Sequence, residues 1–144
     1  MKHRRNKIRS YQHFVWTTYN RLPLVTSEIE RPVYRYIETV CRPVNCDVLA
    51  IGGMPDHVHL LVGFPATITF AQLMNRAKGG SSRFVCDELL PDEWFAWREN
   101  YAVFSVSPHD KAKTIAYIRN QREHHQNNTL WFAVENFDDE TEDE

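Results

Sequence analysis

Residues 46–64, CDVLAIGGMPDHVHLLVGF, predict two β-strands joined by a tight turn. The first strand is expected over Cys46–Ile51 and the second over His57–Phe64, because aliphatic and β-branched residues fill both runs. Between them, the residues GGMPD combine glycine, proline and aspartate, which favour turns. This strand pair decides the fold class, because the flanking segments repeat the same alternation of strand and helix.

On the N-terminal side, YQHFVWTTY at Tyr11–Tyr19 is rich in aromatic and β-branched residues and predicts a first strand. A helix is expected to follow, capped by Ser27 and running through Val40, with Pro32 tolerated near its first turn. The N-terminal half therefore contributes a strand and a helix ahead of the central pair.

On the C-terminal side, a second helix is expected over about 68–85, which Gly79 and Gly80 can interrupt. A fourth strand is expected over Tyr101–Val106, and a last helix over about 108–125, whose start is marked by Ser107, Pro108 and Asp110. The order β-α-β-β-α-β predicts an α+β fold: a ferredoxin-like (RRM-like) antiparallel sheet with helices on one face, plus the C-terminal helix.

Composition indicates one ordinary globular domain over residues 1–134, followed by an acidic segment, 135–144, that we expect to be disordered. The apolar runs are too short for a transmembrane helix, and none follows the basic N-terminus as in a secretory signal. The three cysteines form no CxxC pair, which is typical of the reducing cytoplasm, so we expect a cytoplasmic protein without a membrane partner.

Charge is distributed unevenly along the chain, although the net charge is only −2. Because seven of the 19 acidic residues lie in 135–144, residues 1–134 carry 17 basic and 12 acidic side chains, a net charge of +5. Basic residues gather in the first ten positions and again between Ala66 and Cys86. Such surfaces can neutralise phosphates, but they are equally typical of a solvated face.

His57 and His59 are two residues apart on an expected strand, so their imidazoles point to the same face. Two neighbouring neutral imidazoles supply half of a divalent-metal site. Alternatively, the two histidines simply lie on an exposed face of the sheet. The opposite strand face, with Val58 and Leu60, is expected to turn toward the core.

Tyr117 and Gln121 are four residues apart on the last expected helix and therefore share a helical face. The amide oxygen of Gln121 is a hard ligand suited to Mg²⁺ or Mn²⁺. The phenol of Tyr117 becomes a nucleophile if its proton is removed near a phosphate. The alternative is a core tyrosine beside a surface glutamine.

The histidine pair, followed by a tyrosine and a glutamine one turn apart, resembles the single-tyrosine HUH transposases of bacterial insertion sequences that move as single-stranded DNA. The REP-associated tyrosine transposases are similar. The resemblance covers nearly the whole body of the chain, in the segments HFVWTTYNRLPLV, IGGMPDHVHLLVGF, AKGGSSRF, YAVFSVS and YIRNQREHH.

This resemblance implies a DNA transposase that binds Mg²⁺ or Mn²⁺ through His57, His59 and Gln121. It implies that Tyr117 attacks a phosphodiester, leaving a 5′-phosphotyrosine and a free 3′-hydroxyl that can rejoin strands without a nucleotide cofactor. The implied partners are single-stranded DNA with end hairpins and a second copy of the chain in a homodimer. Whether Tyr117 acts within its own chain or on the partner's site stays open.

Further residues have candidate roles at such a site. Asp56 either orients one imidazole or serves only in the turn. Tryptophans can stack on bases or pack in the core, and the remaining histidines have no spacing that demands a metal. The cations expected to contact DNA are Arg76, Lys78, Arg83 and Lys113.

Other functions fit the sequence less well. A histidine-triad hydrolase needs a third histidine where Leu61 stands, and a two-histidine phosphodiesterase needs a second motif. A replication initiator often carries a lysine soon after its tyrosine, where this chain has Asn120 and Gln121. Two alternatives stay open: a catalytically silent ferredoxin-like module that binds nucleic acid, and a domesticated HUH endonuclease that acts on chromosomal hairpin repeats.

Overall fold

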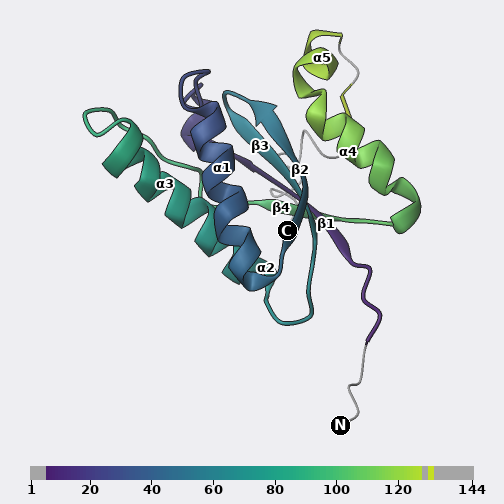
Figure 1. Cartoon of the computed structure of the whole chain (residues 1–144). Coiled ribbons are helices and arrows are strands. Elements are labelled where there is room, and N and C mark those ends of the chain that lie inside the picture. The colour runs from purple at the N-terminus through teal and green to yellow at the C-terminus, as the bar shows by residue number, and fades with distance from the viewer. Residues whose placement is uncertain (1–5, 128–129, 132–144) are drawn as a thin grey trace, which may run out of the picture.

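Four strands form one antiparallel sheet in the order β2-β3-β1-β4 (Figure 1). The computed structural model describes residues 6–127 and 130–131, so the acidic segment 135–144 lies outside the described residues. This order and the antiparallel pairing confirm the predicted ferredoxin-like α+β fold. The strands are β1 (Tyr11–Thr17), β2 (Asp47–Met54), β3 (His57–Gly63) and β4 (Ala102–Val106).

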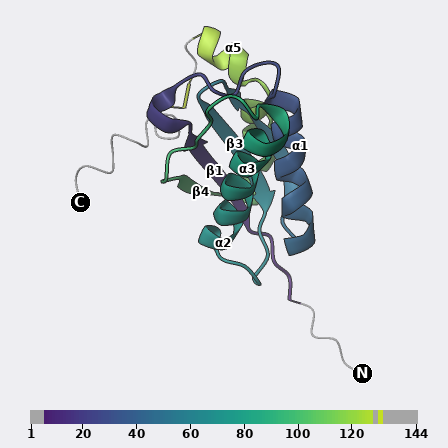
Figure 2. The same cartoon turned by 90° about the vertical axis from the view of Figure 1, so that its left-hand side faces the viewer.

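Helices cover both faces of the sheet (Figures 1 and 2). One face carries α1 (Glu30–Cys41) and a long helical segment that includes α2 (Phe70–Met74) and α3 (Gly80–Phe84). The other face carries α4 (Lys111–Arg119) and α5 (Gln121–Gln126). Short 3₁₀ turns lie at η1 (Tyr19–Arg21), η2 (Arg42–Val44) and η5 (Pro108–Asp110), and π-helical turns at η3 (Asn75–Gly79) and η4 (Val85–Leu89).

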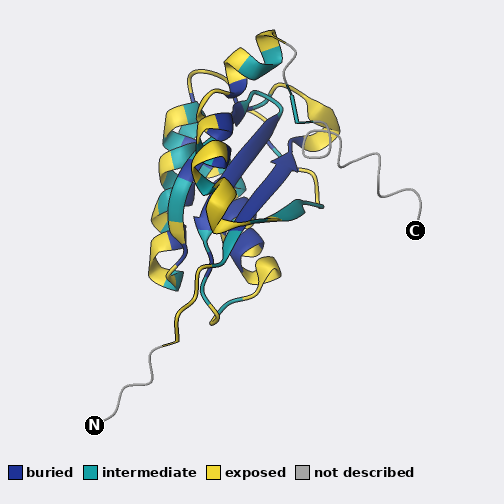
Figure 3. Cartoon of the chain, turned by 90° about the vertical axis from the view of Figure 1, so that its right-hand side faces the viewer, coloured by how far each residue is buried: buried dark blue, intermediate teal, exposed yellow. Residues whose placement is uncertain are grey.

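The main core lies between the sheet and the layer of α1, α2 and α3. Because side chains alternate along a strand, every second residue of β1 and β3 enters this core. In Figure 3 the two central strands, β1 and β3, are mostly dark blue, whereas yellow, the colour of exposed residues, marks much of the helices. The buried side chains of this core include Phe14, Trp16, Val33, Ile37, Val58, Leu60, Val62 and Leu73. A smaller cluster on the opposite face holds Ala50, Leu61, Tyr117 and Ile118.

Several predicted boundaries shift in the structure. Ser27 does not cap α1; the N-cap is Ile29, whose buried side chain anchors the helix start without a side-chain cap. Gly79 and Gly80 have helical backbone angles and do not interrupt the helix. A side chain at Gly80 would overlap the ring of Tyr36, so glycine permits the close approach of α1 and α3.

The turn and the last helix also differ from the prediction. Gly52 and Gly53 belong to β2, and the turn before β3 is formed by Pro55 and Asp56. The predicted cap is confirmed, since the Ser107 hydroxyl accepts a hydrogen bond from the backbone N–H of Asp110. The helix that follows breaks at Asn120, where the backbone leaves helical geometry between α4 and α5. Within the described residues, no helix is long and apolar enough to cross a membrane.

Candidate active site

His57 and His59 lie on the face of β3 that points away from the main core. Their side chains are 2% and 0% exposed, and their ring centroids are 5.0 Å apart. The C-terminal helices cover this face, so the alternative of two histidines on an exposed sheet face is wrong. Val58 and Leu60 enter the main core, as their alternation with the histidines predicts.

Gly52 determines how closely α4 approaches the sheet. A Cβ at this position would lie only 2.5 Å from the backbone oxygen of Ile118. The missing side chain therefore lets the backbone of α4 rest directly on β2, beside the strand that carries the histidines. This contact brings Tyr117 and Gln121, each 2% exposed, onto the histidine face. Tyr117 and Gln121 are thus both buried, and the alternative of a surface glutamine is wrong.

The amide of Gln121 joins α5 to the histidine pair. Its Oε1 lies 3.2 Å from His57 Nε2, and its Nε2 donates to the Tyr117 carbonyl at 3.4 Å. The second bond orients the amide so that the oxygen, rather than the nitrogen, faces the imidazole. His125 approaches the same oxygen, with Nε2 at 3.2 Å.

Asp56 orients His57 from the other side and also stands in the turn, so it serves in both candidate roles. Its Oδ1 lies 2.7 Å from His57 Nδ1, while Arg21 approaches Oδ2 at 3.8 Å. Burial opposes ionisation of Asp56, but the hydrogen bond and the charges of His57 and Arg21 outweigh it, so the pKa of this carboxyl falls below its ordinary value. Because the Asp56 carboxylate holds the Nδ1 side of the ring, the opposite nitrogen of His57, Nε2, faces Gln121.

His13 holds the second imidazole, a contact that sequence reasoning missed. It is 1% exposed, and its Nε2 lies 2.9 Å from His59 Nδ1. Only the pairing of β1 with β3 brings the two rings together, since they are far apart in the chain. His125 was missed as well, although its spacing of four residues from Gln121 places the two on one helical face.

Tyr117 is enclosed by aromatic rings. Its ring stands edge-on to His59, with centroids 5.9 Å apart, and His124 lies 4.7 Å away on a tilted plane. Trp131 stacks on the phenol at 4.0 Å and 10°, and its backbone N–H donates to the Tyr117 hydroxyl at 3.1 Å. Trp131 therefore contacts both the ring and the hydroxyl of Tyr117.

Three of the four cations expected to contact DNA lie in the layer of α1, α2 and α3, across the sheet from Tyr117. Arg76 donates from Nε to the Val40 carbonyl at 3.2 Å, and Arg83 is exposed on α3. Lys78 is 9% exposed, and burial lowers the pKa of its ammonium to about 8. That ammonium donates to the carbonyls of Arg98, Glu99 and Asn100 at 2.7–3.0 Å.

Of the four cations, only Lys113 lies on α4, the helix that carries Tyr117 and is called the tyrosine helix below. It is exposed and lines a cavity next to His13. The tryptophans have two different environments. Trp16 and Trp97 pack in the main core, whereas Trp94 is 59% exposed.

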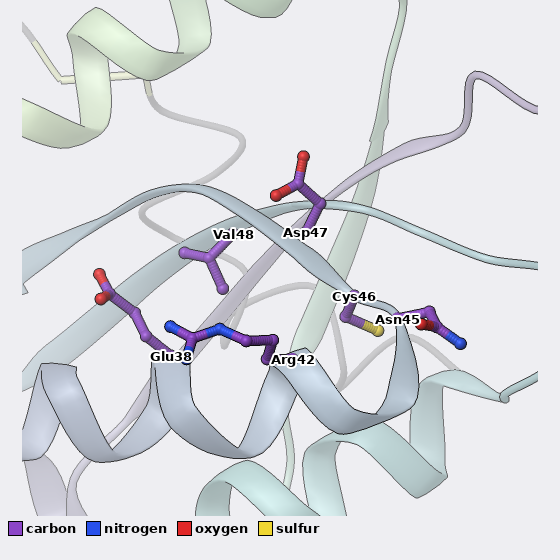
Figure 4. A pocket seen from close by; sticks show the side chains of 6 residues that line it. All are labelled: Glu38, Arg42, Asn45, Cys46, Asp47 and Val48. Carbon is purple, nitrogen blue, oxygen red and sulfur yellow. The ribbon is translucent and has the colours of Figure 1, made fainter.

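A hollow of about 420 Å³ lies at the opposite end of β2 and β3 from His57, between the end of α1 and the start of β2 (Figure 4). None of the predicted site residues lines it, so we do not assign it to the active site. Its lining residues are Glu38, Arg42, Asn45, Cys46, Asp47 and Val48.

The chain is similar in sequence and fold to known transposases. A family model described as IS200-like transposase matches residues 6–121. The ISDra2 transposase TnpA of Deinococcus radiodurans is 24% identical over 116 residues, which cover 77% of this chain and 83% of the relative. Among solved structures, a protein of Deinococcus radiodurans R1 described as a transposase superposes with a TM-score of 0.66 and 25% identity, over 84% of this chain and 98% of that one.

A second solved structure, of a REP-associated tyrosine transposase bound to a REP hairpin, has a TM-score of 0.64. It is 16% identical and covers 87% of this chain and 74% of its own. At that identity the likeness supports the fold alone.

Proposed function

This chain belongs to the IS200-like transposase family, and we propose that it cleaves and rejoins single-stranded DNA through a covalent bond between Tyr117 and a 5′ phosphate. The observation that carries the proposal is the meeting of Tyr117, Gln121 and the His57–His59 pair on one buried sheet face. A catalytically silent nucleic-acid-binding module needs none of these contacts.

The donor atoms fit a divalent ion. Asp56 approaches Nδ1 of His57, so in the neutral form of the imidazole Nδ1 carries the proton, and Nε2 is an acceptor that faces the Gln121 oxygen, 3.2 Å away. In that form the two acceptors repel each other, a bound cation would relieve the repulsion, and imidazole nitrogen with amide oxygen suits Mn²⁺ or Mg²⁺. In residues 6–127 and 130–131, no three histidine, cysteine or acidic side chains could hold a metal together. Gln121 offers a further donor atom beside His57. We propose His57, His59 and Gln121 as ligands.

Such an ion would supply Lewis-acid stabilisation of the phosphate oxygens and of the departing 3′ oxygen. The chain's own residues position the reaction. Asp56 and His13 hold the two imidazoles, and the hydrogen bond from Gln121 to the Tyr117 carbonyl links the amide to the tyrosine helix. This bond spans the break at Asn120 and fixes the separation between Tyr117 on α4 and Gln121 at the start of α5.

In the proposed cleavage, Tyr117 Oη forms a bond to phosphorus while the bond from phosphorus to the 3′ oxygen breaks. The phenol releases one proton, and the departing oxygen takes up one to become a hydroxyl. Since one phosphate ester replaces another, the bond energy is kept, and rejoining reverses the step without a nucleotide cofactor. Attack by a new 3′-hydroxyl on the phosphotyrosine then joins strands.

We propose single-stranded DNA with end hairpins as the substrate, in line with the hairpin bound by the REP-associated neighbour. The contact of Tyr117 with His59 of the same chain supports assembly of the site within one chain. A homodimer remains our expectation, and it does not require exchange of the tyrosine helix.

Covalent trapping tests the proposal. Labelled single-stranded DNA from the ends of the element that flanks the gene is incubated with the protein, with and without Mg²⁺ or Mn²⁺, and separated on a denaturing gel. We expect a metal-dependent adduct that Tyr117→Phe abolishes and His57→Ala strongly reduces. Tyr19→Phe, at a 47% exposed tyrosine, is the matched control and should retain the adduct. Binding without an adduct on the genuine ends would instead favour the silent module.

A further inference from the structure

A cavity of about 350 Å³ lies between the edge strand β4 and helix α4. Two of its walls touch the active site: His13 lies 2.9 Å from the His59 ring, and Trp131 stacks on Tyr117. The cavity is therefore separated from the nucleophile by one side chain. It is lined by His13, Phe104, Ser105, Val106, Asp110, Lys113, Thr114 and Trp131.

The lining combines a flat apolar surface with a cation. Phe104 is half-buried and packs with Trp131 against Val15, and Lys113 is exposed at the opposite wall on α4. Asp110 is the acidic residue of the lining, and the Ser107 hydroxyl donates to its carboxylate at 3.2 Å. An aromatic ring beside a lysine is the arrangement with which proteins hold an unpaired nucleotide, with the base on the ring and the phosphate at the ammonium.

Basic residues continue from the cavity along the same end of the sheet. Lys111 on α4 lies over the Tyr11 ring, with Nζ 5.1 Å from its centroid. Tyr11 pairs with Val106 of the cavity, so the segment that enters β1, with exposed Lys7 and Arg9, begins beside the cavity. This charge complements a phosphate backbone that leaves the cavity.

We propose that this cavity binds one nucleotide of a single DNA strand, next to the phosphate that Tyr117 attacks. The base lies against Phe104 and its phosphate contacts Lys113. A base-paired nucleotide cannot enter, since its faces are covered by stacking, so the cavity selects single strands. The inference rests on the proposed function for its substrate class and adds a subsite to it.

The test measures binding without cleavage, in EDTA, by fluorescence anisotropy. The probes are a labelled thymidine 12-mer and an abasic 12-mer with the same backbone. Phe104→Leu keeps apolar volume but removes the ring, and Phe70→Ala, an exposed aromatic residue in the other helix layer, is the matched control. Lys113→Ala is compared with Arg35→Ala, an exposed cation on α1.

We expect Phe104→Leu to weaken binding of the thymidine probe about tenfold, within the range of base–aromatic stacking, and to leave the abasic probe unchanged. Lys113→Ala should weaken both probes and lower the slope of log K against log salt by about 0.7, the loss of one single-strand phosphate contact. The two control variants should behave as wild type.

Equal binding of the thymidine probe by Phe104→Leu and Phe70→Ala would overturn the proposal. A second result would also overturn it. If deleting residues 135–144 and the Phe104→Leu substitution both raised the affinity for the thymidine probe, the chain's own acidic segment would be the occupant of the cavity. Since no cleavage is involved, failure to trap Tyr117 leaves this test intact. If Tyr117 forms the adduct but Phe104→Leu binds the thymidine probe as tightly as wild type, only the proposed subsite is rejected.

Discussion

Replacing Gly52 with alanine should separate the two halves of the proposed active site while leaving the fold intact. The new Cβ would lie 2.5 Å from the Ile118 carbonyl oxygen, whereas ordinary contacts begin at 3.4 Å. The neighbouring atom is backbone and cannot rotate away, so α4 must move from β2 by about 0.9 Å, the difference between these two distances. Tyr117 precedes Ile118 on this helix, and Gln121 follows within a turn.

The displacement has two measurable consequences. Overpacking of this kind costs about 1–3 kcal/mol of unfolding free energy, which urea denaturation followed by circular dichroism can measure. A misplacement of about 1 Å at the reacting groups costs on the order of 100-fold in rate. The rate of adduct formation at saturating metal, under conditions where the variant is folded, should therefore fall by about that factor.

Gly63→Ala is the matched control for this prediction. It lies at the far end of β3, where a Cβ would meet Asp47 at an ordinary 3.6 Å. We expect wild-type adduct formation from this variant. If Gly52→Ala formed the adduct at the wild-type rate, the close contact of α4 with β2 would not set the position of Tyr117, and our account of site assembly would be refuted.

Three further predictions follow from buried or paired groups. Lys78→Met should lower the unfolding free energy by about 1–3 kcal/mol, because three carbonyls lose their donor. The DNA affinity of this variant should depend on salt concentration as that of wild type does. A smaller slope of log K against log salt would instead show that Lys78 contacts the DNA. Burial raises the pKa of Cys41 to about 12 and of Cys46 to about 11, so iodoacetamide at pH 8 should modify both thiols only after unfolding. The thiols of the unfolded chain have a pKa near 9, so the stability gained by burying them in the neutral form is fully present below pH 9. It is lost as pH rises through 11–12, which the midpoints of urea denaturation across this range can measure. In a mixed dimer of Tyr117→Phe and His57→Ala chains, the adduct should stay at the low level of the His57→Ala variant, whereas recovery of one adduct per dimer would show that the helices that carry Tyr117 are exchanged between the chains.

The order of strands and helices could be predicted because each element carries a local signal. Alternation at His57, Val58, His59 and Leu60 assigns one face of β3 to polar groups and the other to the core. The spacing of Tyr117 and Gln121 predicts one shared helical face. Alternation and spacing are local signals, although the helix breaks at Asn120 and the hydrogen bond from the Gln121 amide to the Tyr117 carbonyl joins the two residues across the break.

What covers each face was decided only by the tertiary structure. Gly52 and Gly53 have the local chemistry of a turn, yet they lie in a strand, because α4 and the neighbouring strand approach too closely for a side chain. His13 meets His59 through strand register, and Lys78 reaches three carbonyls of a distant loop. A basic residue carries the same charge in every setting, so only packing distinguishes a structural cation from one that faces DNA.

The sequence by itself determined the fold class, since periodicity and residue type are encoded locally, and its resemblance to a family singled out the candidate site residues. The tertiary structure decided which of those residues meet and which neighbours orient them. Such contacts join segments far apart in the chain, and their geometry follows from how helices and strands pack rather than from any local pattern.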